Sequence, residues 1–364
     1  MKKIKLLFIT IICVMCLTSC NQITQTQTQT QIVTKIEEEV EVTQIQSQIT
    51  EAYRQAEKGC VGIYVSNGIS AGIGSGVIYN KDGLTYYVVT NAHVVEKMTN
   101  IKIYFGDEKY LDADLIGYDT KNDVAVLSFT RDSSNINASD LYVHDLFNYE
   151  DIDSLTIGQT VLAIGCPLDL ENYNVLTTGV VSHYNYSGIT HDASINPGNS
   201  GGGLFNLSGR LIGLNTSKET TTTTSDGVVT LEGRGHAISF HVLKKCIQDI
   251  INNGTNVERP LLGISVTSFN TALDSDTYEK YKMYLPDGDT RNGYVLVTGF
   301  ADVSAAKSCG VLEGDLLIKI NDNDIYSTTI ISQVLAITTK DDIVKLTVYR
   351  KTTNSMIDIN VIFS

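Results

Sequence analysis

The chain has 364 residues, a length that suggests two domains rather than one. Hydrophobic residues make up 42% of it, and Gly is frequent (29) while Pro is scarce (4), which excludes a disordered chain and favours a β-rich protein with tight turns. The formal net charge of −14 argues against a protein that binds nucleic acid, because such a surface repels phosphate.

The first segment of the chain is typical of an export signal. Three lysines among the first five residues precede an apolar run over residues 6–17, which is too short to cross a bilayer. The run ends in Leu-Thr-Ser-Cys, a tetrapeptide that resembles a bacterial lipobox, in which Cys20 is lipidated and becomes the first mature residue. An ordinary signal peptide cleaved before a Cys is the alternative. We therefore expect a lipoprotein signal peptide over residues 1–19, and a protein anchored by lipid to the cell membrane on its extracytoplasmic side.

A low-complexity segment follows the predicted signal. Residues 21–34 are dominated by alternating Gln and Thr and cannot build a core alone, which indicates a tether. Further on, Ile45, Ile49 and Tyr53 have helical spacing. Residues 20–57 are thus predicted to be a tether and a helix that leads into the first domain.

The first catalytic candidate is a histidine at the end of a predicted strand. A strand-like run over residues 85–89 leads into Thr-Asn-Ala-His-Val-Val over residues 90–95. His93 would therefore stand on a rigid support. Its near-neutral pKa suits a general base that later returns the proton as an acid. A structural role is the alternative for an isolated histidine.

The second candidate is an aspartate that opens a predicted buried strand. Asp123 directly precedes the apolar run over residues 124–127. A carboxylate there needs hydrogen-bond partners, and the ring N–H of His93 would supply one while fixing the tautomer. Asp119, four residues earlier in a predicted turn, is the competing acid and is expected to be solvated.

The third candidate is a serine among glycines. Residues 196–202 read Asn-Pro-Gly-Asn-Ser-Gly-Gly, and the glycines allow the sharp turn that an exposed nucleophile needs. The segment Gly198, Asn199 and Ser200 is predicted to form the oxyanion hole, with the N–H groups of Gly198 and Ser200 as donors. A plain surface turn is the alternative for this stretch alone. The order His, Asp, Ser along the chain is that of chymotrypsin-like proteases, whereas subtilisins and α/β-hydrolases use other orders.

Together these motifs resemble the HtrA/Deg family of serine proteases. Three further segments share the likeness: residues 74–78, 164–167 and 178–182. The resemblance covers roughly residues 58–364 and is strongest at the three catalytic motifs. It implies a mainly β protein in which a double β-barrel, chymotrypsin-like protease domain over residues 58–254 is followed by an α+β PDZ domain over residues 259–364. It also implies a homotrimer and no cofactor.

The substrate pocket is predicted from the same resemblance, with departures. Gly203 stands where the family usually has Pro, and residues 235–240 match the family's substrate-pairing strand only loosely. The predicted pocket residues are Ser194, Ile195, Asn196, His236, Ala237 and Ile238. Because no acid stands six residues before the nucleophile, we expect small or medium apolar substrate side chains there, not Arg or Lys. His191 is interpreted as a loop histidine without a catalytic role.

The C-terminal part carries a second set of motifs. Residues 259–264, Arg-Pro-Leu-Leu-Gly-Ile, resemble the carboxylate-binding loop and first strand of an HtrA-type PDZ domain, and residues 311–321 resemble its Gly-Asp signature. The likeness implies a peptide or C-terminal ligand held by backbone N–H groups. Its expected contacts are Leu261, Leu262, Gly263 and Ile264. A small α+β domain without a ligand is the alternative. Residues 270–292, with four Asp, are predicted to be a solvated insertion.

The cysteines do not indicate a metal site. Three of the seven lie in the leader, and the others are scattered without a Cys-x-x-Cys pair, which argues against zinc. Buried free thiols are the favoured interpretation and one or two disulfides the alternative. No metal is expected.

The sequence thus predicts a serine endopeptidase that cleaves unfolded or damaged secreted or envelope proteins through an acyl-enzyme. Two alternatives remain open: a non-proteolytic chaperone or peptide-binding scaffold, and a processing protease of narrow specificity. Expected partners are polypeptide substrates, a peptide at the PDZ groove, the membrane through lipid on Cys20, and two further copies of the chain, but no nucleic acid.

Overall fold

The computed structural model describes residues 44–131, 141–147, 155–218, 221–224, 227–230, 233–254, 256–270, 275–289 and 291–363. The predicted signal peptide, Cys20 and most of the tether lie outside the described residues. The chain divides after Tyr53 into two units, and the described part of the first unit is helical. No helix in the described ranges is long and apolar enough to span a membrane.

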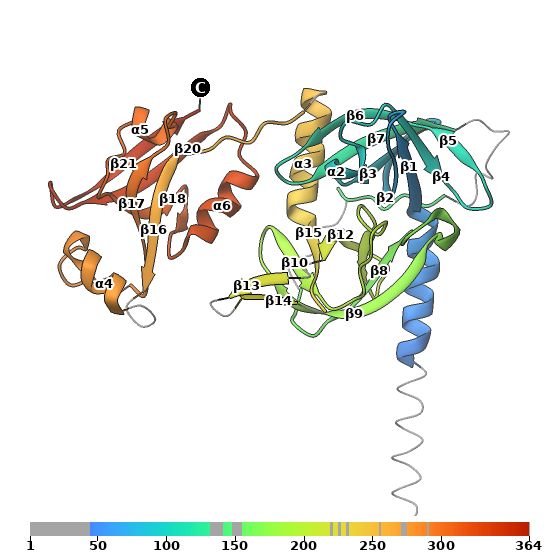
Figure 1. Cartoon of the computed structure of the whole chain (residues 1–364), viewed down its shortest axis with the longest axis horizontal. Helices are drawn as coiled ribbons and strands as arrows, with labels where there is room; N and C mark the ends of the chain where they lie inside the picture. The colour runs from blue at the N-terminus through green and yellow to red at the C-terminus, as the bar shows by residue number, and fades with distance from the viewer. Residues whose placement is uncertain are drawn as a thin grey trace, which may run out of the picture. The chain divides into compact units, whose positions relative to one another are not determined.

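The first seven strands form one antiparallel sheet in the order β5-β4-β1-β2-β3-β7-β6 (Figure 1). Its elements are β1 (Cys60–Ser66), β2 (Ala71–Asp82), β3 (Thr85–Thr90), α2 (Ala92–Val95), β4 (Asn100–Tyr104), β5 (Tyr110–Asp112), β6 (Asp114–Asp119) and β7 (Val124–Thr130). Side chains alternate between the faces, so Val61, Ile63 and Val65 of β1 all enter the core. The terminal strand β5 also contacts β7, and the sheet therefore curls around that core.

The second group of strands closes into a barrel in the order β10-β15-β12-β11-β8-β9. Its strands are β8 (Thr160–Gly165), β9 (Val175–Tyr184), β10 (Gly188–His191), β11 (Gly203–Asn206), β12 (Leu211–Lys218) and β15 (Gly235–Ser239), with a side hairpin of β13 (Thr221–Thr224) and β14 (Gly227–Thr230). A curled sheet followed by a closed barrel confirms the prediction of a mainly β, chymotrypsin-like fold.

Helix α3 (Phe240–Asn253) joins the two sheets, because it packs against β6 and β7 of the first and β12 and β15 of the second. The side chain of Ser239 accepts a hydrogen bond from the Val242 N–H and caps its start. Gly254, with φ of 61°, ends the helix in the left-handed conformation that glycine adopts most easily.

The C-terminal part is an α+β structure around a sheet in the order β16-β17-β18-β20-β21, with β19 beside β18. Its strands are β16 (Ile264–Asn270), β17 (Gly293–Phe300), β18 (Leu316–Ile320), β19 (Asn323–Asp324), β20 (Ile343–Arg350) and β21 (Ser355–Ile362), and its helices are α4 (Ser275–Tyr281), α5 (Ala305–Ser308) and α6 (Thr328–Ala336). Helices α5 and α6 cover an apolar core that includes Val295, Leu317 and Leu346.

The prediction of a solvated insertion over residues 270–292 is wrong for its described helical part. Tyr278 and Tyr281 of α4, with Tyr284 after it, pack against a separate cluster that contains Phe269 and Tyr294. The sequence interpretation weighted the aspartates and overlooked the three-residue spacing of Tyr278, Tyr281 and Tyr284, which places side chains on one face of a helix.

The four cysteines in the described residues are free thiols: Cys60, Cys166 and Cys246 are buried and Cys309 is half-buried.

Candidate active site

The acid–base pair is assembled at the adjacent ends of two paired strands. His93 lies in α2 directly after β3, Asp123 directly precedes β7, and the β3–β7 ladder ends at Thr90 opposite Ala125. The His93 Nδ1 atom is 2.8 Å from Oδ2 and 3.0 Å from Oδ1 of Asp123. The backbone N–H of His93 donates to the same carboxylate at 3.0 Å. The structure therefore brings two of the three predicted catalytic side chains together.

The two groups stabilise each other's charged forms. Hydrogen bonding to Asp123 raises the pKa of His93 above its ordinary value of 6.5, although partial burial opposes the shift. Burial alone would raise the pKa of Asp123, but hydrogen bonds from His93 and Thr216 outweigh it and hold that pKa below its usual value. The carboxylate thus stays ionised, and the ring nitrogen that faces it carries a proton.

Thr216 of β12 is a site residue that the sequence analysis missed. Its hydroxyl donates to Asp123 Oδ2 at 2.6 Å, and its carbonyl accepts a hydrogen bond from Ser200 Oγ at 2.9 Å. A single threonine in a strand has no distinctive sequence signature, so only its hydrogen bond to Asp123 in the folded protein reveals this role. Thr216 links the acid to the predicted nucleophile.

Ser200 lies beside this pair with its hydroxyl turned toward Thr216. Within the described part of the chain, no hydrogen bond joins Ser200 Oγ to His93. The Ser200 carbonyl is fixed from the other side, because it accepts the N–H of Ser75 in β2 at 2.8 Å. A rotation of the hydroxyl about the Cα–Cβ bond is therefore needed before the imidazole can take its proton.

The turn before Ser200 has the backbone that an oxyanion hole requires. Gly198 has φ of +99°, and a Cβ there would collide with the Cys166 carbonyl oxygen, so only glycine fits. Among the described residues, neither the N–H of Gly198 nor that of Ser200 donates a hydrogen bond, which leaves both available. The Asn199 N–H, in contrast, donates to the Asn196 carbonyl at 3.0 Å. The two N–H groups without an acceptor are thus those of Gly198 and Ser200, the same two that the sequence analysis names as donors.

Ser75 holds this turn in place. Its hydroxyl donates to the Gly198 carbonyl at 2.7 Å and accepts the N–H of Cys166 at 2.9 Å. One side chain from the first sheet thus joins two segments of the second barrel.

The predicted pocket residues lie on two neighbouring segments. Ile195 is buried, whereas Ser194 and Asn196 before the nucleophile are exposed. In β15, Ala237 and Ile238 are buried and His236 is half-buried. The two segments meet at Gly235, because a Cβ there would contact Ile195 and His191 side chains. The residues involved are Ser194, Ile195, Asn196, His236, Ala237 and Ile238.

His191 differs from its prediction as a loop histidine. It ends strand β10, is fully buried, and its Nε2 atom is 3.2 Å from Asn215 Oδ1. Burial lowers its pKa to about 4, so the ring is neutral at physiological pH. The Asn215 carbonyl in turn accepts the N–H of Gly201 at 2.8 Å. His191 therefore supports the turn around Ser200 indirectly, through Asn215.

Asp119 also differs from its prediction as a solvated acid. Its side chain is fully buried and forms an ion pair with Arg259 at 2.8 Å. Its Oδ1 accepts the backbone N–H of Asn122 at 3.0 Å, so it stabilises the turn that leads to Asp123. Arg259 lies 140 positions after Asp119 in the chain, so no local sequence pattern predicts this ion pair.

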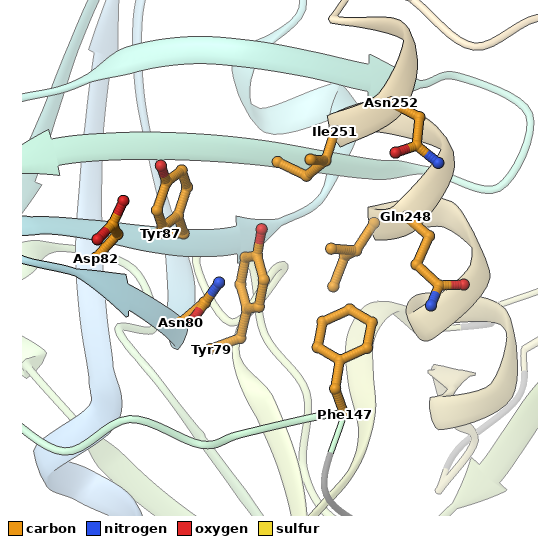
Figure 2. Close-up of a pocket in the computed structure, with 9 residues that line it drawn as sticks. Tyr79, Asn80, Asp82, Tyr87, Phe147, Gln248, Ile251 and Asn252 are labelled. Atoms are coloured by element: carbon orange, nitrogen blue, oxygen red, sulfur yellow. The ribbon is translucent and has the colours of Figure 1, made fainter.

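A pocket of about 470 Å³ lies away from these residues (Figure 2). Figure 2 shows Tyr79 and Phe147 beside helix α3, which contributes Gln248, Ile251 and Asn252 to the lining. Tyr79 is four positions beyond Ser75 along β2, near the end of that strand. None of the three predicted catalytic residues, His93, Asp123 and Ser200, lines this pocket. In the described residues no group of three or more His, Cys, Asp or Glu side chains could hold a metal ion.

Comparison with known proteins agrees with this geometry. Residues 74–214 match the family of trypsin-like peptidase domains. The fold and the site therefore define a trypsin-like serine protease.

The relatives narrow the class further. The chain is 32% identical over 302 residues to the serine protease Do-like HtrA of Lactococcus lactis subsp. lactis (strain IL1403), which covers 79% of this chain and 70% of that protein. It is 31% identical to the Do-like HtrA of Bacillus subtilis (strain 168), over 74% of this chain and 59% of that one. The solved structure of the HtrA-type protease AlgW with a tripeptide has a TM-score of 0.65 at 27% identity, covering 86% of this chain and 95% of that one. The chain belongs to the HtrA serine proteases, and it is a serine endopeptidase.

Proposed function

We propose that Ser200, His93 and Asp123 are the catalytic triad of an endopeptidase that cleaves unfolded or damaged proteins outside the cytoplasm. The observation that carries the proposal is the bonded series from His93 through Asp123 and Thr216 to the Ser200 hydroxyl. Each group in that series has a function in acyl transfer.

In the first half of the reaction, the Ser200 hydroxyl turns from Thr216 to His93 Nε2 and gives up its proton as Oγ bonds to the peptide carbonyl carbon. The N–H groups of Gly198 and Ser200 hold the oxygen that becomes negative. His93 then protonates the leaving amine as the C–N bond breaks, which leaves an acyl-enzyme. In the second half, water gives a proton to His93 as its oxygen bonds to the acyl carbon, and His93 passes that proton to Ser200 Oγ as the ester C–O bond breaks. Asp123 stabilises the imidazolium in both halves.

The substrate class follows from the position of the proposed pocket. Ile195 and the buried residues of β15 offer a small apolar site, and β15 is one strand of a hydrogen-bonded barrel. A substrate that reaches the triad must present an extended backbone, and unfolded polypeptides do so without cost in folding free energy.

The C-terminal part supports a second peptide site, of the PDZ kind. Strand β16 is at the edge of its sheet, so one side of its backbone is open to an added strand. Ile264 and Val266 of β16, with Ile330 and Val334 of α6, are partly buried apolar residues beside that edge. They form an apolar floor for the side chains of an added peptide.

The loop before β16 is arranged for a carboxylate. The Leu262 carbonyl accepts hydrogen bonds from Ser304 and Ala306, both at 3.1 Å, and the Gly263 carbonyl accepts one from Ala301 at 3.0 Å. The carbonyls of Leu262 and Gly263 thus point toward the segment over residues 301–306. Within the described ranges the N–H groups of Leu261, Leu262 and Gly263 donate no hydrogen bond. We propose that they bind the C-terminal carboxylate of a peptide.

We further propose that Cys20 carries the lipid that anchors the protein to the outer side of the cell membrane, and that the enzyme assembles as a trimer. The lipobox-like tetrapeptide and the family resemblance support these two assignments. Metabolic labelling with a fatty-acid analogue, with Cys20→Ala as the control, tests the anchor. Light scattering of the mature protein tests the trimer.

Fluorophosphonate labelling of the mature protein tests the triad. The wild type is expected to be labelled at Ser200 and to degrade unfolded casein, and Ser200→Ala is expected to lose both activities while keeping its melting temperature. Persistent casein cleavage by Ser200→Ala would refute the assignment. Labelling with cleavage of only one or a few peptides would favour the narrow processing protease. Peptide binding without any labelling would favour the scaffold.

A further inference from the structure

An open apolar hollow of about 440 Å³ lies in the first sheet and the loop after β8. Its lining is mostly apolar, with one acid, Asp169, beside the side chains of Tyr64, Ala71, Ile73, Tyr110, Leu168 and Leu170. Tyr64 and Ile73 are directly paired across β1 and β2 and so share one face. A Cβ on Gly62 would lie only 2.9 Å from Leu170, so the glycine makes room for Leu170 to pack over β1.

Two walls of the hollow are continuous with the nucleophile turn. One wall contains Leu168 and Leu170. The Leu168 N–H donates to the carbonyl of Pro197 at 2.8 Å, and Pro197 is three residues before Ser200. The other wall ends at Ile73, two positions from Ser75, whose N–H bonds the Ser200 carbonyl. The hollow therefore adjoins the site where a substrate carbonyl would be attacked.

These contacts place the hollow on one particular side of the nucleophile. Strand β12 bonds the turn on the other side, through Asn215 and Thr216, and β12 pairs with β15 of the proposed acyl pocket. A peptide held with its acyl half beside β15 must extend past Ser75 and Leu168 with its leaving half. The hollow is thus on the leaving-group side.

The backbone of β2 offers a further contact there. Residues 71–76 pair with β1 on one edge, whereas pairing with β3 begins only at Val77. The Ser75 N–H points to the open edge, and Ile73, two positions away, directs its own N–H and C=O the same way. A leaving-group residue that pairs with Ile73 would place its side chain on the face that Ile73 shares with Tyr64, inside the hollow.

Leu168 itself shows the feature that a functional contact requires. Its side chain is 69% exposed, and its backbone has φ of +72°, a left-handed conformation that is costly for leucine. An exposed leucine with a strained backbone is unfavourable in the free protein. A bound ligand that covers the Leu168 side chain would explain why the residue is there.

We infer that this hollow is a substrate subsite for a bulky apolar or aromatic residue within the first two positions after the scissile bond. The inference rests on the proposed proteolytic function and adds to it a preference on the leaving-group side. The occupant is the substrate polypeptide, because the hollow continues into the turn that holds the nucleophile.

Paired quenched-fluorescence peptides test the subsite. Each pair is identical up to the scissile bond and carries either Phe or Ser at the first or at the second position after it. At one of these positions the wild type should show a kcat/KM about 10-fold higher for Phe, as partial burial of an aromatic ring predicts. Tyr110→Ser and Leu168→Asn should reduce this ratio to less than about 3-fold. Asn tolerates the left-handed backbone at position 168.

Ile69→Asn is the matched control, because Ile69 is 98% exposed in the turn between β1 and β2 and does not line the hollow. Its Phe/Ser ratio should equal that of the wild type. Thermal melts exclude loss of folding, and the two subsite variants serve as independent checks on each other.

Several results would overturn the inference. One is an equal kcat/KM for Phe and Ser at both positions in a wild type that fluorophosphonate labels at Ser200. Another is a ratio that survives both substitutions. If the ratio survives while Tyr110→Ser or Leu168→Asn changes the oligomeric state by light scattering, the hollow is instead an interface between copies. A wild type that neither labels nor cleaves any peptide would refute the proposed function and, with it, the subsite.

Discussion

The two halves of the proposed catalytic site are held in different ways. His93 and Asp123 come from neighbouring strand ends of one sheet and make three direct contacts with each other, two through the ring and one through the backbone. Ser200, in contrast, makes no hydrogen bond with that ring in the described residues, and is held by Thr216 of its own barrel and Ser75 of the other sheet.

This difference shows where each half is vulnerable. Both charged members of the acid–base pair belong to one sheet, and only the Thr216 hydroxyl reaches Asp123 from the second barrel, so a change of charge should damage the pair most. The nucleophile turn depends on bonds that cross between the first sheet and the second barrel, so a loss of alignment should damage it most. The following substitutions separate the two kinds of damage.

The largest effect is expected from Asp123→Asn. Asn removes the charge, yet it tolerates the left-handed backbone that Asp123 adopts with φ of 56°. The carboxamide cannot stabilise the imidazolium or fix the tautomer, so kcat should fall about 10⁴-fold. Steady-state kinetics with a peptide substrate would measure it, and the melting temperature should change little. A loss below about 10-fold would contradict the proposed role of Asp123.

The pH profile provides the control for that change. The base must be neutral to accept a proton, so wild-type kcat/KM should rise with pH through the His93 pKa, which Asp123 holds above the ordinary 6.5. Without the carboxylate the His93 pKa falls, and the acidic limb of the residual activity should move to lower pH. An acidic limb at the same pH in both proteins would show that another group controls it.

The sequence singles out the three catalytic candidates but not the residues that hold them in place, for a physical reason. Each of the three candidates stands in a short motif that local structure explains. His93 follows a strand, Asp123 precedes a buried strand, and Ser200 lies in a glycine-rich turn. Thr216, Ser75 and Arg259 act through partners far away in the chain, and a single threonine, serine or arginine has no local signature. Asp119 was misjudged for the same reason, because its burial depends on Arg259. The aromatic cluster around Phe269 was readable from tyrosine spacing and was overlooked.

Arg259→Met is expected to have a smaller effect on kcat and to lower mainly the free energy of unfolding. The arginine is fully buried and pairs with Asp119 at 2.8 Å and with Asp249 of α3 at 2.7 Å. Its loss leaves the buried Asp119 without its cation and leaves Asp249 paired with Lys245 alone, which should cost about 3–5 kcal/mol of unfolding free energy. Because Asp119 supports the turn before Asp123, kcat should fall as well. Urea unfolding measures the first effect and peptide kinetics the second.

Lys345→Met is the control for that prediction. Lys345 pairs with Asp358 at 2.7 Å, but both side chains are about half exposed, at 51% and 55%. Its removal should cost less than about 1 kcal/mol. If Arg259→Met were no more destabilising than Lys345→Met, the buried network would not hold the acid turn in place.

The smallest effect is expected from Ser75→Ala, which tests the nucleophile half alone. The hydroxyl is the donor to the Gly198 carbonyl, so without it the Gly198–Asn199 peptide is free to turn, and the oxyanion donors lose part of their alignment. Complete loss of one donor costs about 10²–10³ in kcat, and partial misalignment should cost about 10–100-fold, with KM nearly unchanged. The rate of fluorophosphonate labelling should fall in parallel. Ser70→Ala is the matched control, because that hydroxyl bonds only Asn67 in an exposed turn. A raised KM with normal kcat would instead assign Ser75 to substrate binding, and the barrel-crossing bonds would then not govern the nucleophile.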